Sequence, residues 1–335
     1  MILTYKVKHN MDFGDELRKA KRVANYAVKT KSRSSADVAD IGLKSMISNQ
    51  ILKKYSGNKK IKRVKRVNLI VPSQGIQCNQ ISKEIYIPCL DLRFNYQFPN
   101  DFVKINQIEI NKEYCFVSVT KVELEQLNTD GFIGVDLNTT EHVAVIADPS
   151  TGKVKKLGKK CYHTHKKYSN TRKRLQHQGK FAKLACVKNR ESRIVRDTNH
   201  KISRAIVDEA KRVNKAIVLE DLTGIRRNKK QKRSFKYALH SWSFYQLREF
   251  VSYKAKLLGV PVVFIPPHYT SQMCSRCGQV GNRQGKTFKC PHCGHVDHAD
   301  VNAAFNISKL WHRSIAFQTE MDATGTLISP KSKCA

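Results

Sequence analysis

The run Phe132-Ile133-Gly134-Val135-Asp136-Leu137 decides the fold. It is a short apolar stretch of the kind that forms a buried strand, and one acid interrupts it. After a polar turn, residues 142–147 predict the second strand of a hairpin, and residues 152–157 predict a third strand. A buried carboxylate is unfavourable unless a positive group meets it, so Asp136 marks a place where chemistry is expected.

Two more apolar runs downstream of the hairpin predict further strands. Residues 216–221 (Ala-Ile-Val-Leu-Glu-Asp) and 260–265 (Val-Pro-Val-Val-Phe-Ile) are short and rich in β-branched residues. Long helices are predicted over 166–213, a helix over 244–258, and a final helix from Asp300. The order of three strands, helices, strand, helix, strand and helix is typical of an α/β RNase H-like fold.

Three acids lie inside or beside apolar runs, where a buried carboxylate is unfavourable: Asp136, Glu220 and Asp300. Separately, each has an ordinary interpretation, as a turn residue, a strand-end surface acid and a helix N-cap. In an RNase H-like sheet, however, the first strand and the strand after the first helix are parallel neighbours, and the last helix projects its first-turn acid toward them. Converging carboxylates repel unless divalent cations neutralise them, and hard oxygen ligands suit Mg²⁺ or Mn²⁺. Two such ions about 4 Å apart would support phosphodiester hydrolysis, so the trio predicts a nuclease pocket.

Ten cysteines are present, and four of them form two Cys-x2-Cys pairs separated by twelve residues. This spacing, with glycine after the second cysteine of each pair, predicts a structural zinc ribbon, and redox pairs are the alternative. The expected ligands are Cys274, Cys277, Cys290 and Cys293. Four thiolates leave the zinc no open position for catalysis. Three nearby histidines are expected at the surface or against nucleic acid: His292, His295 and His298.

The composition points to a polyanionic partner. The 335 residues include 62 Lys and Arg against 27 Asp and Glu, a net charge of +35, and 40% are hydrophobic. The apolar content excludes a protamine-like basic tail, and the length predicts two or three domains. Counterion release makes nucleic acid the natural partner, with a ribosomal-type protein or a membrane-surface binder as alternatives. A polar, strand-like start and the lack of an 18-residue apolar run predict a cytoplasmic protein, nucleoid-associated in a prokaryote, that binds no membrane.

The first 130 residues have a different pattern of apolar and basic residues. Apolar residues at helical spacing predict helices over 11–57, and a strongly basic stretch over 53–66 follows. From Val67 to about Glu123, short β runs alternate with turns. These features predict a small β-barrel or sandwich with a basic helical insertion near its start.

Four motifs in this order resemble those of the TnpB family, transposon-encoded RNA-guided endonucleases related to compact type V CRISPR effectors. They are Gly134-Val135-Asp136-Leu137-Asn138, Leu219-Glu220-Asp221-Leu222, Thr270-Ser271-Gln272-Met273-Cys274-Ser275-x-Cys277-Gly278 and Asp300-Val301-Asn302-Ala303-Ala304-Phe305-Asn306-Ile307. The resemblance covers residues 131–310. It implies a RuvC-like nuclease domain with Asp136, Glu220 and Asp300 as catalytic acids. It also implies a guide RNA and cleavage of double-stranded target DNA beside a short adjacent motif.

The resemblance also implies the domain boundaries. A wedge-like barrel is expected over 1–10 and 66–130, with a helical recognition insert over 11–65. A RuvC-like domain is expected over 131–267 and 299–313, a zinc ribbon over 268–298, and a flexible tail over 314–335. Many family members have Asp-Arg-Asp where this chain has Asp297-His298-Ala299-Asp300, so Asp297 competes with Asp300 for the third catalytic position.

Three basic runs, residues 53–66, 153–196 and 226–236, are candidate walls of a channel for a guide–target duplex. Their candidate phosphate contacts are Arg172, Lys173, Arg174, Arg226, Arg227, Lys229 and Lys230. Aromatic residues that could stack on unpaired bases, or else pack in the core, are Tyr162, Tyr168, Tyr237, Trp242 and Tyr269. Two other functions stay open: a strand-transfer transposase, and an RNA-guided DNA-binding protein that does not cleave.

Overall fold

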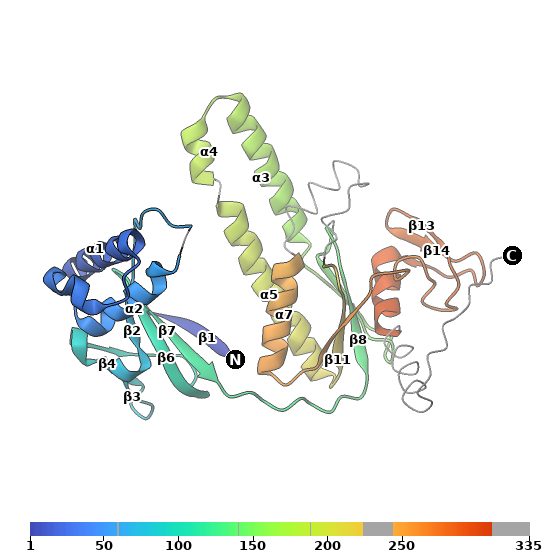
Figure 1. Ribbon diagram of the computed structural model, residues 1–335. Coiled ribbons are helices and arrows are strands. Elements are labelled where there is room, and N and C mark those ends of the chain that lie inside the picture. Colours follow the sequence, from blue (N-terminus) through green and yellow to red (C-terminus); the bar gives the residue numbers. More distant parts are fainter. Residues whose placement is uncertain (59, 140, 188, 224–243, 310–335) are drawn as a thin grey trace, which may run out of the picture. The chain divides into compact units, whose positions relative to one another are not determined.

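The computed structural model of this chain describes residues 1–58, 60–139, 141–187, 189–223 and 244–309. The chain divides into two units, Met1–Glu123 and Leu124–Ala335 (Figure 1). Several predicted features lie outside the described residues. They are the basic run 226–236 with Arg226, Arg227, Lys229 and Lys230, the aromatic residues Tyr237 and Trp242, and the 314–335 tail.

The first unit contains two antiparallel sheets. The larger has the order β1-β7-β6-β2, formed by β1 (Ile2–Lys8), β7 (Tyr114–Lys121), β6 (Phe102–Ile110) and β2 (Leu69–Pro72). The smaller has the order β3-β4-β5, formed by β3 (Gln77–Asn79), β4 (Glu84–Ile87) and β5 (Leu92–Asn95). Every second residue of β7 is buried, as the period of a strand with one core face requires. The short strands predicted between Val67 and about Glu123 are confirmed, whereas their closure into a barrel stays a prediction.

The predicted helical insertion lies between β1 and β2. It comprises α1 (Gly14–Thr30), the 3-10 segment η1 (Ser35–Ile41) and α2 (Ser45–Ser56). In α1, Ala20, Val23, Ala24 and Ala27 are buried at three- and four-residue spacing, which places one apolar stripe on the core. These residues pack in the same hydrophobic cluster as the strands, so the insertion and the sheets share one core.

The second unit contains the predicted α/β sheet. Its order is β10-β9-β8-β11-β12, with β8 (Phe132–Leu137), β9 (Ala144–Ala147), β10 (Val154–Leu157), β11 (Ala216–Glu220) and β12 (Val262–Ile265). The first three strands pair antiparallel, and β11 lies parallel between β8 and β12. The predicted order of strands and the predicted parallel pairing of the first strand with the strand at 216–220 are therefore confirmed, and the structure adds that β12 is also parallel to β11.

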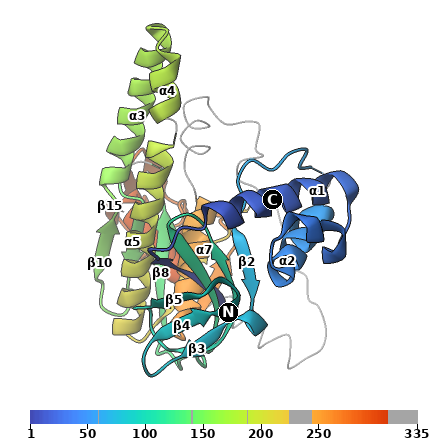
Figure 2. The ribbon, with the colours of Figure 1, turned by 90° about the vertical axis from the view of Figure 1, so that its left-hand side faces the viewer.

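Helices cover both faces of this sheet. The helices with named bounds are α3 (Lys160–His177), α4 (Phe181–Val187), α5 (Arg190–Arg212) and α7 (Phe244–Leu257). Apolar residues of α5 and α7 share a core with Ile133, Val135, Ile217 and Leu219 on one face. A helix over 299–309 packs on the opposite face (Figure 1). In Figure 2, α3 and α5 run side by side and α4 lies at the far end of the pair.

Gly134 allows the 299–309 helix to approach β8 closely. A Cβ atom at Gly134 would lie 2.0 Å from the backbone oxygen of Ala304 and 2.7 Å from the backbone nitrogen of Ser308. Real side chains do not tolerate such distances from backbone atoms, so glycine is required at this position. The helix therefore rests directly on the backbone of β8, two residues before Asp136.

A small antiparallel sheet joins β12 to this helix. It consists of β13 (Asn282–Gln284), β14 (Thr287–Lys289) and β15 (Val296–His298), in that order. The four paired cysteines lie around it, in the segment predicted to be a ribbon. Within the described residues, every helix is too short or too polar to cross a bilayer.

Candidate active site and metal centres

The strand register places Asp136 and Glu220 beside each other. Val135 pairs with Leu219 in the parallel β8–β11 ladder, so the next residue on each strand is Asp136 and Glu220 respectively. Val135 and Leu219 point into the α5–α7 core. Since successive side chains alternate between the faces of a sheet, both acids point to the other face.

The same face carries the helix that contains Asp300. This residue lies in the first turn of the 299–309 helix, and only 1% of its surface is exposed. Asp136 is 7% exposed and Glu220 is partly buried. Asp300 therefore does not act as an exposed N-cap, and Glu220 is not a freely solvated strand-end acid.

The charges of the other two carboxylates affect Asp136. Burial, together with the negative charges of Glu220 and Asp300, raises the pKa of Asp136 to about 7, while Asn138 and Arg283 act in the opposite direction. Burial also raises the pKa of Glu220, against the hydrogen bond from Thr270 and the charge of Arg283. Ionised together, these acids form a region of concentrated negative charge.

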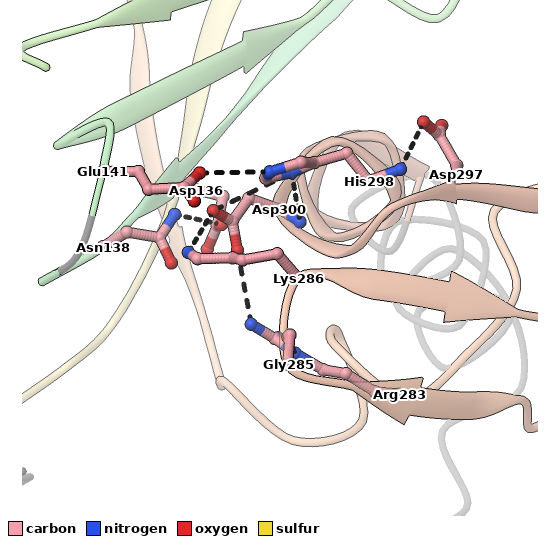
Figure 3. A network of polar contacts seen from close by, with 9 residues as sticks. All are labelled: Asp136, Asn138, Glu141, Arg283, Gly285, Lys286, Asp297, His298 and Asp300. Atoms are coloured by element: carbon pink, nitrogen blue, oxygen red, sulfur yellow. Dashed lines mark hydrogen bonds and ion pairs between the residues drawn. The ribbon is translucent and has the colours of Figure 1, made fainter.

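Polar neighbours contact each of the three acids, and Figure 3 shows those of Asp136 and Asp300. Asn138 Nδ2 donates to Asp136 Oδ2 at 2.7 Å, and Thr270 Oγ1 donates to Glu220 Oε1 at 2.5 Å. Two cations from the β13–β14 hairpin contact Asp300: Lys286 Nζ lies 2.5 Å from Oδ2 and Arg283 Nη2 lies 3.2 Å from Oδ1. Each acid is thus held in one orientation by a neighbour.

The donor set fits hard divalent cations. Carboxylate oxygens are the ligands that Mg²⁺ and Mn²⁺ prefer, and burial together with the charges of Glu220 and Asp300 raises the pKa of Asp136, so a cation bound there would relieve both effects. Among the described residues, only the four cysteines form a metal-ligand cluster with all donor atoms within 4.8 Å of one another. The three carboxylates are neighbours by strand register and by their effect on Asp136, but their oxygens do not form a cluster as tight as that of the cysteines.

The four cysteines form a compact thiol cluster. The Sγ atoms of Cys274 and Cys293 lie 3.6 Å apart, and those of Cys277 and Cys290 lie 3.5 Å apart. All four donor atoms are mutually within 4.8 Å, a geometry that suits tetrahedral zinc. The predicted ligand set is brought together in full. The other described cysteines are free thiols: Cys78, Cys89, Cys115, Cys161 and Cys186.

Two buried asparagines attach this cluster to the acid-bearing helix. Asn302 Nδ2 donates to the backbone oxygen of Met273 at 2.7 Å, and its Oδ1 accepts from the backbone N–H of Ser275 at 2.8 Å. Asn306 Nδ2 donates to the backbone oxygens of Thr270 and Met273. The first cysteine knuckle and the start of the helix are consequently held as one piece.

Asp297, the competing candidate, lies elsewhere. Its Oδ1 accepts from the backbone N–H of His298, and its side chain points away from Asp136 (Figure 3). His298 turns its ring to the acids instead: Nδ1 accepts from the backbone N–H of Asp300, and Nε2 lies 3.4 Å from Glu141. These contacts favour Asp300 over Asp297 as the third acid of the cluster.

The predicted nucleic-acid contacts on α3 divide into two kinds. Arg172 forms an ion pair with Glu191 at the α3–α5 contact, where His165 Nδ1 also lies 2.6 Å from Glu191. Lys173 and Arg174 are exposed. Of the described aromatic candidates, Tyr162 and Tyr269 are exposed and Tyr168 is partly buried.

Sequence reasoning missed the residues that hold the acids. In the sequence, Thr270 is only one residue of a motif, and nothing distinguishes Arg283 or Lys286 from the many other basic residues. A signal was available for Asn302 and Asn306, because amides four residues apart in an apolar helix share one buried face and require partners. The chain carried no comparable signal for Lys286.

Comparisons with known proteins agree with this geometry. Residues 244–307 match the family model described as the Cas12f1-like TNB domain. A TnpB-like protein of Methanocaldococcus jannaschii is 32% identical over 229 residues, which are 65% of this chain and 82% of the relative. The CRISPR-associated endodeoxyribonuclease Cas12f1 of Sulfoacidibacillus thermotolerans is 33% identical over 61% of this chain, which spans only 50% of that protein. The putative RNA-guided DNA endonuclease InsQ of Escherichia coli is 26% identical over 72% of this chain and 66% of its own length.

Proposed function

The chain belongs to the family of TnpB-like proteins, and from that premise we propose that it is an RNA-guided DNA endonuclease that cleaves target DNA beside a short adjacent motif. The observation that carries the proposal is the meeting of Asp136, Glu220 and Asp300 on one face of the sheet. Relatives named as CRISPR-associated endodeoxyribonuclease and as putative RNA-guided DNA endonuclease support it.

In this proposal the three acids are catalytic and hold two Mg²⁺ ions, for which Mn²⁺ can substitute. Bound there, the ions would activate water and stabilise the leaving oxygen of the phosphodiester. The protein supplies the arrangement: Asn138 orients Asp136 and Thr270 orients Glu220. The cysteine cluster holds a structural zinc that keeps the ribbon attached to the helix of Asp300.

We also propose the domain boundaries that the sequence predicted. The helices α1 and α2 fall within the 11–65 insert, and β13–β15 with the four cysteines fall within the 268–298 ribbon, which supports both. The wedge-like barrel (1–10 and 66–130), the RuvC-like domain (131–267 and 299–313) and the guide-RNA channel belong to the same proposal. Lys173 and Arg174 are its described phosphate contacts, because both are exposed on α3.

The test is a cleavage assay with the protein and the RNA that copurifies with it. After the RNA is sequenced, DNA that matches its guide is incubated with Mg²⁺ beside randomised flanking sequence. Asp136→Ala and Asp300→Ala should bind this DNA without cutting it, and Asp297→Ala is the matched control that should still cut. Guided binding without any cleavage by the unmodified protein would instead indicate a binding protein. Joined DNA ends formed without RNA would indicate a strand-transfer transposase.

A further inference from the structure

Asp300 is a buried carboxylate with a cation on each oxygen. Lys286 Nζ lies 2.5 Å from Oδ2 and Arg283 Nη2 lies 3.2 Å from Oδ1 (Figure 3). Both cations come from the β13–β14 hairpin, fourteen and seventeen residues before the acid. The backbone N–H of Ala299 donates to the backbone oxygen of Lys286 at 2.8 Å, which ties this hairpin to the start of the helix.

We propose that Lys286 is an internal counter-ion of Asp300 that a divalent cation must displace before the acid can act as a metal ligand. The inference rests on the proposed metal-dependent nuclease. A metal bound to Asp300 Oδ2 at the 2.0–2.1 Å typical of Mg²⁺ would lie close to the Lys286 ammonium, which is 2.5 Å from the same oxygen, and the two cations would repel each other. This repulsion favours departure of the ammonium when the metal binds.

The structure distinguishes the group that leaves from the group that stays. The Arg283 Nε atom also donates to the backbone oxygen of Gly285 at 3.2 Å, so its guanidinium is fixed within its own turn. The ammonium of Lys286 is a compact charge on a flexible stem; exposure does not distinguish the two groups, because the side chains of Lys286 and Arg283 are 26% and 33% exposed. Lys286 is therefore the displaced group, and Arg283 stays as a positioning residue.

The arrangement also explains how the acids are tolerated together. With Lys286 in contact, the charge of buried Asp300 is compensated although Asp136 and Glu220 lie nearby. Exchange of Lys286 for a metal would make Asp300 Oδ2 available as a ligand. The zinc ribbon thus contributes a removable charge to the acid site in addition to its structural role.

Lysine acylation followed by mass spectrometry tests this inference without using activity. On the intact protein, Lys286 should be protected without divalent metal and should become about tenfold more reactive when Mn²⁺ or Mg²⁺ is added. Lys215, which is buried in an ion pair with Asp148 on another part of the unit, is the internal control and should not change. In parallel, the Mn²⁺ affinity of Lys286→Met, measured by electron paramagnetic resonance, should rise by about tenfold, and Lys286→Arg should stay near the unmodified protein.

The outcomes separate this inference from the proposed function. If Mn²⁺ binds at an Asp136-dependent site while Lys286 reactivity and the Mn²⁺ affinity of Lys286→Met are unchanged, the displacement is wrong and the metal site stands. If the unmodified protein binds no Mn²⁺ and cuts no guided target, both are wrong. Since the acylation arm uses the unmodified chain, a folding defect of a variant cannot obscure the result.

Discussion

Replacing Asp136 by asparagine should make the protein more stable while it abolishes cleavage. Burial and the charges of Glu220 and Asp300 raise the pKa of Asp136 from 3.8 to about 7, so the folded state holds a proton that the unfolded state has released between these two values. Stability therefore falls as pH rises from 4 through 7. Asparagine keeps the shape and an oxygen that accepts from Asn138, but it has no charge to bury.

The magnitude follows from the shift. The pKa of Asp136 rises by about 3, and each unit corresponds to about 1.4 kcal/mol of folding free energy. Burial of this carboxyl group therefore lowers the free energy of unfolding by up to about 4 kcal/mol at pH 8 and by up to about 2 kcal/mol at pH 5. Asp136→Asn should raise the free energy of unfolding by up to these amounts. Mg²⁺ should stabilise the unmodified protein and leave the variant unchanged, since a ligand stabilises only the state that binds it.

Urea unfolding followed by circular dichroism at both pH values, with and without Mg²⁺, measures this. Asp148→Asn is the matched control, for which the free energy of unfolding should fall and not rise. Burial alone would raise the pKa of Asp148, but hydrogen bonds from Lys215, Thr151 and Ser150 hold it at about 2. Its stabilising effect is present at neutral pH and lost as pH falls through about 2, so this variant should be less stable. A loss of stability in Asp136→Asn, or a gain that is the same at pH 5 and pH 8, would refute the reasoning.

Three further changes test other parts of the molecule. Cys290→Ser should lose one equivalent of zinc and unfold the ribbon, as measured by metal analysis and thermal melting; a zinc-free variant of full stability would contradict the ribbon. Lys173→Ala with Arg174→Ala should weaken target binding and lower the slope of log affinity against log salt by about 1 to 2, and an unchanged slope would remove α3 from the nucleic-acid surface. Gly134→Ala should destabilise the second unit by about 3 kcal/mol or more, because the added Cβ meets backbone at 2.0 Å; chemical denaturation should show it, and a neutral result would contradict the close approach.

The α/β sheet could be predicted because its signals are local. The run 132–137 becomes β8 with the same bounds, and the run 216–221 becomes β11 with one residue fewer. An acid inside each apolar run was visible in the sequence, and the parallel topology then placed Asp136 beside Glu220. The cysteine spacing was equally informative, since metal geometry constrains it directly.

The partners of the acids could not be predicted because they depend on how separate segments pack. Lys286 is one of 62 basic residues, and only the path of the β13–β14 hairpin brings it to Asp300. Arg172 was predicted to face nucleic acid, but the α3–α5 contact pairs it with Glu191. Such pairings arise from tertiary structure, which charge counting along the chain does not encode.

The contact at Gly134 has a consequence for how this site can vary. Since backbone touches backbone there, no side-chain rotamer lies between β8 and the helix of Asp300 at this contact. A larger residue at position 134 would push the helix away from the strand and shift Asp300 relative to Asp136. A substitution at this one position can therefore change the spacing of the acids without altering either acid.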